Sequence, residues 1–277
     1  MTAAILITGG TGTLGSHVVP LLRANGHDVR ILSRTDHAPR EGVECLTGDL
    51  LTGEGVERAV EEADTVLHLA GGRKGDDEAT RTLVRAASGA GVRHLVLISV
   101  IGADRVPLGW FRAKLAAEQA VTESGVAWTL LRAAQFHDLV LDVLQKMTRL
   151  PVIPVPGGLR FQPVDSREVA ARLVELALDE PAGRVADLAG PRVYGMGELV
   201  RGYLRATGRR RVLMPVRMPG KAGRAYRAGD NLSLDQAASG RLTWEDFLAE
   251  RLAATGGGRT TRPDASRPTK GGTATGE

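Results

Sequence analysis

ILITGGTGTLG, residues 5–15, sets the architecture of this 277-residue chain. Its apolar start, Ile5-Leu6-Ile7, is typical of a buried β-strand, and the glycines after it match G-x-G-x-x-G from Gly10 to Gly15. Glycines there permit a tight turn and a close approach of the backbone to a pyrophosphate, whose charge the N-terminus of the following helix favours. We therefore expect a dinucleotide-binding turn. Its residues are Gly9, Thr11, Gly12, Thr13, Leu14 and Gly15.

Around this turn, short apolar runs alternate with longer amphipathic stretches, which is typical of βαβ units on a parallel sheet. The expected strands are residues 4–8, 29–33, 43–47, 65–69, 95–99 and 128–132. The expected helices are residues 14–25, 54–62, 77–90, 111–124 and 136–148. The pattern predicts an α/β fold with a doubly wound parallel sheet of the Rossmann type.

The regular alternation ends near Thr148. Pro151, Pro154 and Pro156 predict an irregular connection, because proline is not tolerated in a helix interior or a central strand. A capping box from Asp165 to Glu168 then starts another helix. We expect a dinucleotide-binding core over 1–150, a small substrate-binding or lid part over 151–255 that is interleaved with the core, and a disordered tail over 256–277.

Composition limits the compartment and the partners. Hydrophobic residues make up 43% of the chain, and the single cysteine, Cys45, excludes an internal disulfide or a thiolate metal cluster. With no signal peptide and no run of about 20 apolar residues, we expect a cytoplasmic protein with no membrane partner and no metal. The net charge of +4 is concentrated late in the chain, yet no nucleic-acid motif accompanies it. A nucleic-acid partner is therefore not expected, whereas a small-molecule substrate is, and a homodimer is possible.

The end of the second expected strand indicates which dinucleotide binds. An acidic residue there would bind the 2′-hydroxyl of NAD, but this chain has Ser33 and Arg34, and a guanidinium suits a 2′-phosphate. The sequence thus favours NADP(H), while the nearby Asp36 keeps NAD(H) possible. Other positions at strand ends are expected to face the same ligand. These are Asp49, Leu50, Ala70, Gly71, Ala134 and Gln135. His68, inside a strand, is expected to be a packed histidine.

Several further stretches resemble one known family. They are Ile7–Gly12, Leu97–Ser99, Lys114–Glu118, Leu131–Phe136 and Pro163–Asp165. With them the chain resembles the atypical short-chain dehydrogenases/reductases of the NmrA-like, NAD(P)H-binding kind, from Ala4 to about Leu252. The resemblance implies a Rossmann fold and NAD(P)H binding. It says little about substrate, because such families include reductases, isomerases and non-catalytic redox sensors.

The same resemblance implies a catalytic serine, tyrosine and lysine, in which tyrosine protonates the nascent alkoxide. Ser99 matches the serine and Lys114 the lysine, but Trp110 stands where the tyrosine would be. An indole N–H only donates a hydrogen bond and does not act as an acid. The three tyrosines of the chain all come late, at Tyr194, Tyr203 and Tyr226.

Two functions follow from this departure. The first is an NADPH-dependent oxidoreductase that transfers hydride to a small apolar carbonyl or quinone-like compound without the usual tyrosine. Lys114 would fix the nicotinamide ribose, Ser99 would hold the acceptor oxygen, and aromatic residues would form the substrate pocket. Those aromatic residues are Trp110, Phe136 and Phe161. The alternative is a non-catalytic sensor of the NADP/NADPH ratio that docks a partner.

Overall fold

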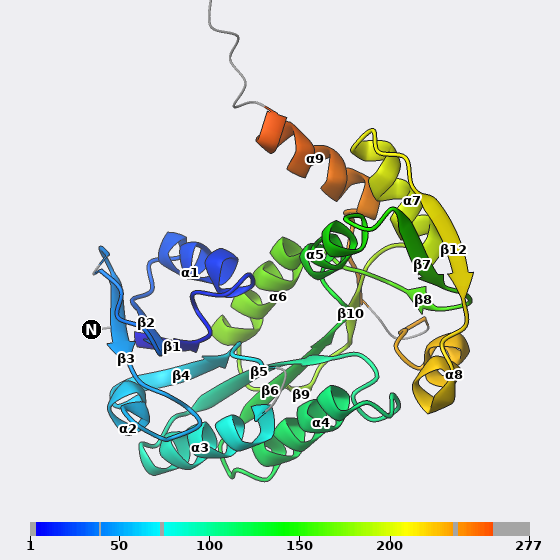
Figure 1. Cartoon of the computed structure of the whole chain (residues 1–277). Helices are drawn as coiled ribbons and strands as arrows, with labels where there is room; N and C mark the ends of the chain where they lie inside the picture. Colours follow the sequence, from blue (N-terminus) through cyan, green and yellow to red (C-terminus); the bar gives the residue numbers. More distant parts are fainter. Residues whose placement is uncertain (1–3, 39, 73–74, 235–237, 257–277) are drawn as a thin grey trace, which may run out of the picture.

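The computed structural model describes residues 4–38, 40–72, 75–234 and 238–256. Its centre is a parallel sheet in the order β13-β10-β6-β5-β4-β1-β2-β3, with β9 paired to β6 (Figure 1). The first half of the chain supplies β1 (Ala4–Thr8), β2 (Val29–Ser33), β3 (Val43–Thr47), β4 (Ala63–His68), β5 (His94–Val100) and β6 (Trp128–Ala133). Short edge strands follow as β9 (Gly183–Arg184), β10 (Leu188–Ala189) and β13 (Ala238–Ser239). The predicted doubly wound fold is confirmed.

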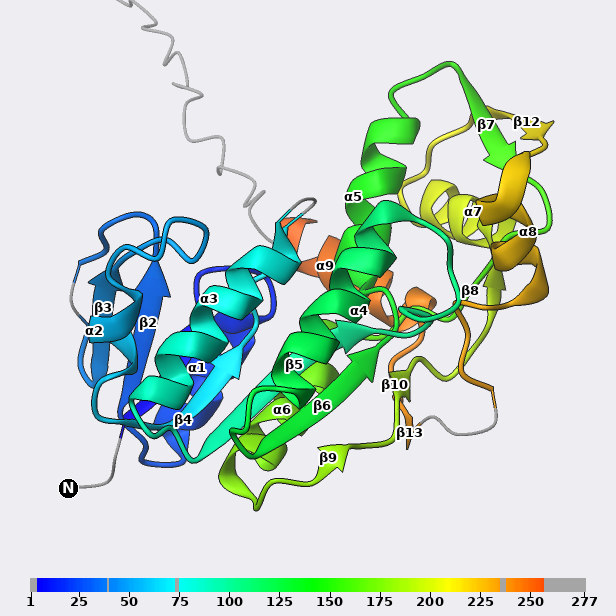
Figure 2. The same cartoon turned by 90° about the horizontal axis from the view of Figure 1, so that it is seen from below.

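Helices cover both faces of this sheet, because buried strands point alternate side chains to opposite faces. Ile5 and Ile7 pack into a core with α1 (Gly15–Ala24) and α6 (Ser166–Leu178), whereas Leu6 belongs to the opposite core. That opposite core lies under α2 (Val56–Val60), α3 (Asp76–Gly89) and α4 (Gly109–Thr122), which Figure 2 shows on one side of the sheet. The crossover helices leave the carboxyl ends of the strands open to a ligand.

The rest of the chain forms a smaller part beside the end of β6. It contains α5 (His137–Met147), β7 (Val152–Pro156), β8 (Arg160–Phe161), β11 (Tyr194–Gly195), α7 (Met196–Ala206), β12 (Val212–Val216), α8 (Gly220–Ala228) and α9 (Trp244–Gly256). Its own core is built on Trp244 and Tyr194, which are almost fully buried. The Tyr194 hydroxyl donates to Glu245 and accepts from the Trp244 amide, at 2.6 and 3.2 Å, which fixes the start of α9.

Two local expectations for this part were wrong. The proline-rich connection contains a strand, β7, which pairs in parallel with β12 in a separate two-stranded ribbon, where edge positions tolerate proline. Asp165 caps α6 as expected, but its side chain accepts from the Arg167 amide at 2.9 Å, whereas the predicted capping box implies the Glu168 amide as donor. Glu168 instead accepts from the amides of Arg241 and Leu242. The expected tail falls outside the described residues from 257 onward, while Gly256 ends α9.

None of the described helices is long and apolar enough to cross a membrane.

Candidate functional site

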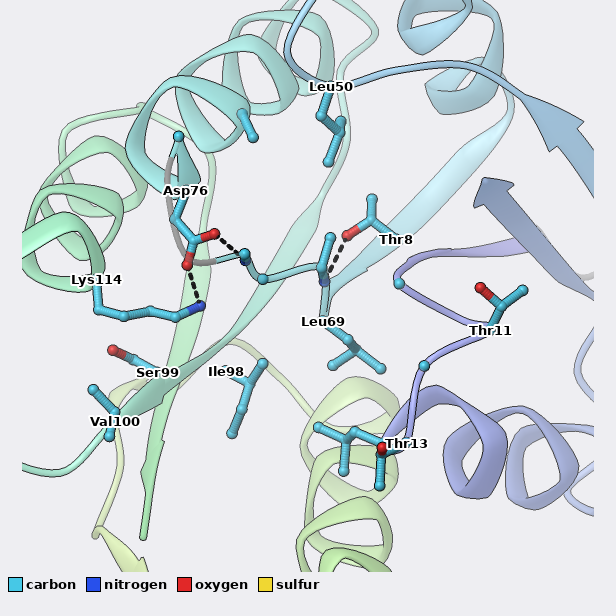
Figure 3. A pocket seen from close by; sticks show the side chains of 18 of the residues that line it. Thr8, Thr11, Thr13, Leu50, Leu69, Asp76, Ile98, Ser99, Val100 and Lys114 are labelled. Atoms are coloured by element: carbon cyan, nitrogen blue, oxygen red, sulfur yellow. Dashed lines mark hydrogen bonds and ion pairs between the residues drawn. The ribbon is translucent and has the colours of Figure 1, made fainter. Parts of the chain in front are cut away.

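A cleft of about 680 Å³ runs along the carboxyl ends of the central strands (Figure 3). Of the predicted site residues, only Gly15 and Phe161 do not line it. Those that do are Gly9, Thr11, Gly12, Thr13, Leu14, Ser33, Arg34, Asp49, Leu50, Ala70, Gly71, Ser99, Trp110, Lys114, Ala134, Gln135 and Phe136. The volume is in the range of small-molecule and cofactor pockets.

The glycine turn between β1 and α1 forms one wall of the cleft. Gly9 has a φ of +73°, and a Cβ there would lie 2.6 Å from the Ala70 nitrogen, so only glycine fits between the two loops. A Cβ on Gly15 would collide with the Gly9 oxygen, which explains why Gly15 is needed behind the turn rather than in the cleft wall. The backbone of the turn is therefore open to close approach by a phosphate.

His68 organises the floor of the cleft through an ordered chain of hydrogen bonds. The Thr80 hydroxyl donates to the Asp76 carbonyl at 2.6 Å, so it must accept from His68 Nε2 at 2.9 Å. His68 Nδ1 then accepts from the Thr8 hydroxyl at 2.6 Å, and Thr8 accepts from the Ala70 amide. Burial, and secondarily the charge of Lys114, lower the pKa of His68 to about 3. The neutral ring thus ties β1 and β4 to the start of α3.

Lys114 faces the cleft from α4 and forms an ion pair that the sequence analysis did not predict. Its Nζ lies 2.9 Å from Oδ2 of Asp76, and the two side chains are only 10% and 6% exposed. The other carboxylate oxygen of Asp76 accepts from the Gly72 amide, as Figure 3 shows. Asp76 is the first residue of α3, where a carboxylate also interacts favourably with the helix dipole. This pair holds the ammonium beside Gly71, at the end of β4.

Ser99, near the end of β5, is part of a buried charged network. Its hydroxyl donates to Glu118 at 2.5 Å, and Glu118 accepts two hydrogen bonds from Arg132, at 2.8 and 2.6 Å. Arg132 also donates to Asp104 at 2.8 Å. Burial opposes the charge of Arg132, but the hydrogen bonds and charge of Glu118 outweigh it and raise the pKa of Arg132. Because its one hydroxyl hydrogen is used in the hydrogen bond to Glu118, Ser99 can only accept a hydrogen bond from a group in the cleft.

The aromatic residues fall into two groups. Trp110 and Phe136 line the cleft, and Trp110 packs edge-on against Phe111 with ring centroids 5.1 Å apart. Phe161, expected at the substrate site, instead packs against Tyr226 at 5.6 Å. Tyr226 does not line the cleft either, and burial raises its pKa. Phe161 lies in β8, where it pairs with Tyr194 of β11, and it is not among the residues that line the cleft.

Two polar side chains in the cleft have unused binding capacity. Both polar atoms of the Gln135 amide are buried without a hydrogen-bond partner among the described residues. Arg34 is exposed at the cleft rim, and no described residue forms an ion pair with it. Beside Arg34, the Ser33 hydroxyl lies 3.0 Å from His37 Nε2. Asp49 is already engaged locally, since it accepts from the Leu51 amide at 2.8 Å.

Comparisons with known proteins agree with this geometry. A sequence family described as NAD(P)H-binding matches residues 9–180. The chain is 31% identical over 216 residues to an NAD(P)H azoreductase of Xenophilus azovorans, covering 74% of each chain. It is 32% identical over 213 residues, again 74% of each chain, to a (4-alkanoyl-5-oxo-2,5-dihydrofuran-3-yl)methyl phosphate reductase of Streptomyces griseus.

Solved structures show the same fold. An NADPH-dependent quinone oxidoreductase of Escherichia coli, in complex with NADPH, superposes with a TM-score of 0.76 at 18% identity, over 90% of this chain and 99% of that one. A triphenylmethane reductase of Citrobacter sp., in complex with NADP(H), superposes with a TM-score of 0.73 at 21% identity, over 90% and 99%.

Proposed function

This chain belongs to the NAD(P)H-binding family, as an atypical short-chain dehydrogenase/reductase, and we propose that it is an NADPH-dependent reductase of small apolar carbonyl, quinone-like or azo compounds. The observation that carries this proposal is the Lys114–Asp76 ion pair at the cleft, opposite the glycine turn. The ion pair positions the Lys114 ammonium, which can act as the proton donor in a site that lacks the usual tyrosine.

The cleft has features that fit the dinucleotide. The turn between Gly9 and Gly12 leaves room for a pyrophosphate against the backbone, and the unpartnered Gln135 amide is available to a polar group of the ligand. Arg34, exposed and without an ion pair to a described residue, supports a preference for the 2′-phosphate of NADP(H) over NAD(H).

When bound, NADPH supplies the hydride to the substrate. In this proposal Lys114 binds the nicotinamide ribose and donates a proton to the acceptor atom, which keeps it in the product, and a second proton from solvent then restores the ammonium of Lys114. Asp76 holds the ammonium in place through its ion pair at 2.9 Å. The Ser99 hydroxyl already donates its hydrogen bond to Glu118, so toward the substrate its role is to accept a hydrogen bond or to position that network. Trp110, Phe136 and Leu139 offer apolar surface for a flat substrate.

The test compares binding with turnover. We expect purified protein to bind NADPH more tightly than NADH by fluorescence, and to oxidise NADPH with at least one member of a panel of quinones and azo dyes. Lys114→Met should abolish turnover, whereas Lys221→Met, at an exposed lysine outside the cleft, should not. Tight NADPH binding with no oxidation above the enzyme-free rate would contradict catalysis and favour the non-catalytic sensor of the NADP/NADPH ratio. If Trp110→Tyr then gained reductase activity, the protein would be an enzyme that has lost its catalytic tyrosine.

A further inference from the structure

One lobe of the molecule carries an uncompensated positive charge. Residues 143–164 and 199–229 contain twelve lysines and arginines and no acidic residue, so the rest of the chain carries a net charge of −8. These two segments, which we call the basic lobe, include the end of α5 with β7 and β8, and most of α7 with β12 and α8. Figure 1 shows them together at the end of the molecule opposite β2 and β3.

Within the part of the chain that the structure describes, the cations of the basic lobe lack acidic partners. None of its twelve cationic side chains forms an ion pair with a described residue, although ion pairs are frequent elsewhere in the chain. Several guanidinium groups bond only to backbone carbonyls: Arg211 to Thr148 and Arg210, and Arg160 to Arg227. Arg149, Arg210 and Arg211 line a single shallow hollow with Pro151 and Val212. Their charges therefore face solvent as one group.

Next to this hollow, the β7–β12 ribbon exposes an apolar face. The register pairs Val152 with Val212 and Pro154 with Met214, and alternate residues of a strand share a face. On the inner face, Ile153 and Leu213 pack into the core of the smaller part. On the outer face, Val212 is 65% and Met214 49% exposed, with Val152 at 40%. A contiguous exposed apolar face on a ribbon that already has a packed inner face indicates an interaction site.

We propose that this ribbon face and the arginines around it bind the surface of a membrane rich in anionic lipids. Val152, Val212 and Met214 would enter the boundary between headgroups and acyl chains, while Arg149, Arg210 and Arg211 contact lipid phosphates. A basic rim around an apolar face is the composition that suits peripheral membrane binding. The sequence predicts no membrane partner because it has no run of about 20 apolar residues, and the ribbon face exists only once β7 and β12 are paired.

Other occupants fit this surface less well. A nucleic acid would use the arginines but leave the apolar ribbon bare, and the exposed apolar residues of the ribbon are aliphatic, whereas bases stack on aromatic side chains. A second copy of the chain would bring two positive surfaces together. Residues 257–277 carry net positive charge and contain no leucine, isoleucine, valine, methionine or aromatic residue, so they are poorly suited to cover the ribbon.

The test is co-sedimentation of the full-length protein with vesicles of phosphatidylcholine, alone or mixed with phosphatidylglycerol. We expect binding only to the mixed vesicles, weakening as salt rises. Arg149→Gln with Arg210→Gln should weaken it about 30-fold, since each basic residue contributes about fivefold. Val212→Ser with Met214→Ser should weaken it about tenfold.

Matched variants elsewhere separate this surface from general charge and hydrophobicity. Arg58→Gln with Arg85→Gln removes two exposed arginines of α2 and α3, and Leu21→Ser with Leu178→Ser removes two apolar residues that are 37% and 41% exposed. Both pairs should bind like the unmodified protein. All four variants should keep NADPH binding, so failure here is distinct from failure of the proposed reductase.

Three results would overturn the proposal. They are equal sedimentation with and without phosphatidylglycerol, equal loss in the control pairs, and binding that survives loss of Val212 and Met214. If the Val212→Ser, Met214→Ser variant still bound the vesicles and retained duplex DNA equally tightly, the arginines would be a nucleic-acid-binding surface instead. If the double serine variant does not fold, Met214→Gln alone, at a 49% exposed position, makes the same comparison.

Discussion

Asp76 and Lys114 illustrate how one ion pair determines the chemistry available to the cleft. Both side chains are at least nine-tenths buried, so the charges are costly unless they remain together. The pair also fixes the ammonium relative to Gly71 and, through the Gly72 amide, the loop after β4. Local sequence around Asp76 shows only a glycine followed by acidic residues at a helix start. Its partner lies 38 positions later, and only the packing of α3 on α4 brings the two together.

Removing one member of this pair is expected to destabilise the protein strongly. Asp76→Asn should lower the free energy of unfolding by about 3 kcal/mol, because the buried lysine then lacks its counter-charge. Asp77→Asn, which weakens only the exposed pair with Arg81, should cost less than about 1 kcal/mol. Urea unfolding measures both. Adding Lys114→Met to Asp76→Asn should recover part of the loss, and strictly additive costs would show that the pair is not coupled.

His68 makes a testable contribution to acid sensitivity. Its pKa is about 3 in the folded protein, against 6.5 for an unperturbed histidine, so below pH 6.5 the unfolded state binds the proton more readily. This residue therefore lowers stability as pH falls from about 6.5 toward 3, by at most about 1.4 kcal/mol per pH unit. His68→Gln, whose amide can both accept and donate, should flatten the unfolding free energy over that range. A pH profile of the His68→Gln variant identical to that of the unmodified protein would contradict the assignment.

Arg34 is expected to decide between the two dinucleotides. Arg34→Gln should weaken NADPH binding about 10- to 100-fold, the equivalent of losing about 1.5–3 kcal/mol of charge-assisted hydrogen bonding. NADH binding should change little, because it has no 2′-phosphate. Arg40→Gln removes a second exposed arginine a few residues on and serves as the control. Equal losses for NADPH and NADH would mean that Arg34 does not contact the 2′-phosphate.

At the scale of elements, α6 links the central sheet to the smaller part. Its inner face packs against α1, while Glu168 accepts from the backbone amides of Arg241 and Leu242, at 2.6 and 3.4 Å, just before α9. A carboxylate that accepts from backbone amides of a distant segment is a tertiary anchor, although in the sequence it has the spacing of a capping residue.

Loss of the Glu168 anchor should destabilise the segment at the start of α9, whereas loss of an exposed ion pair on α6 should have a smaller effect. Glu168→Ala is expected to lower the free energy of unfolding by about 1–3 kcal/mol, because two amides lose a charged acceptor. Glu175→Ala on the same helix removes only an exposed pair with Arg172 and should change it by less than about 1 kcal/mol. Chemical denaturation gives both values, and hydrogen exchange should show faster opening of residues 241–248 in Glu168→Ala alone. Equal effects of the two variants would show that Glu168 is not an anchor.

At the scale of the whole molecule, the predictable features were those encoded locally. Apolar runs in the sequence indicate the strands of the first half, and the glycine turn indicates which strand ends face the ligand. The sheet and most cleft residues could therefore be predicted from spacing. The position of Phe161 outside the cleft lining did not follow from spacing, because β8 is two residues long and depends on pairing with β11. The β7–β12 ribbon was missed because its two strands are about 60 residues apart and both contain proline. Pairing over such distances leaves no local periodicity.

The cleft and the basic lobe are separate enough to act independently, which gives a prediction for the whole chain. NADPH at about 100 times its dissociation constant should add about 2.7 kcal/mol of stability, because it binds only the folded state. For a chain of this length that corresponds to a rise in Tm of about 5 °C, measurable by a thermal scan. The Val212→Ser, Met214→Ser variant should show the same rise from its own starting Tm, since distant sites contribute additively. Arg34→Gln at the same NADPH concentration should show a much smaller rise, because its weaker affinity reduces the linkage. A ribbon variant that lost the NADPH shift would show instead that the smaller part and the cleft are energetically coupled.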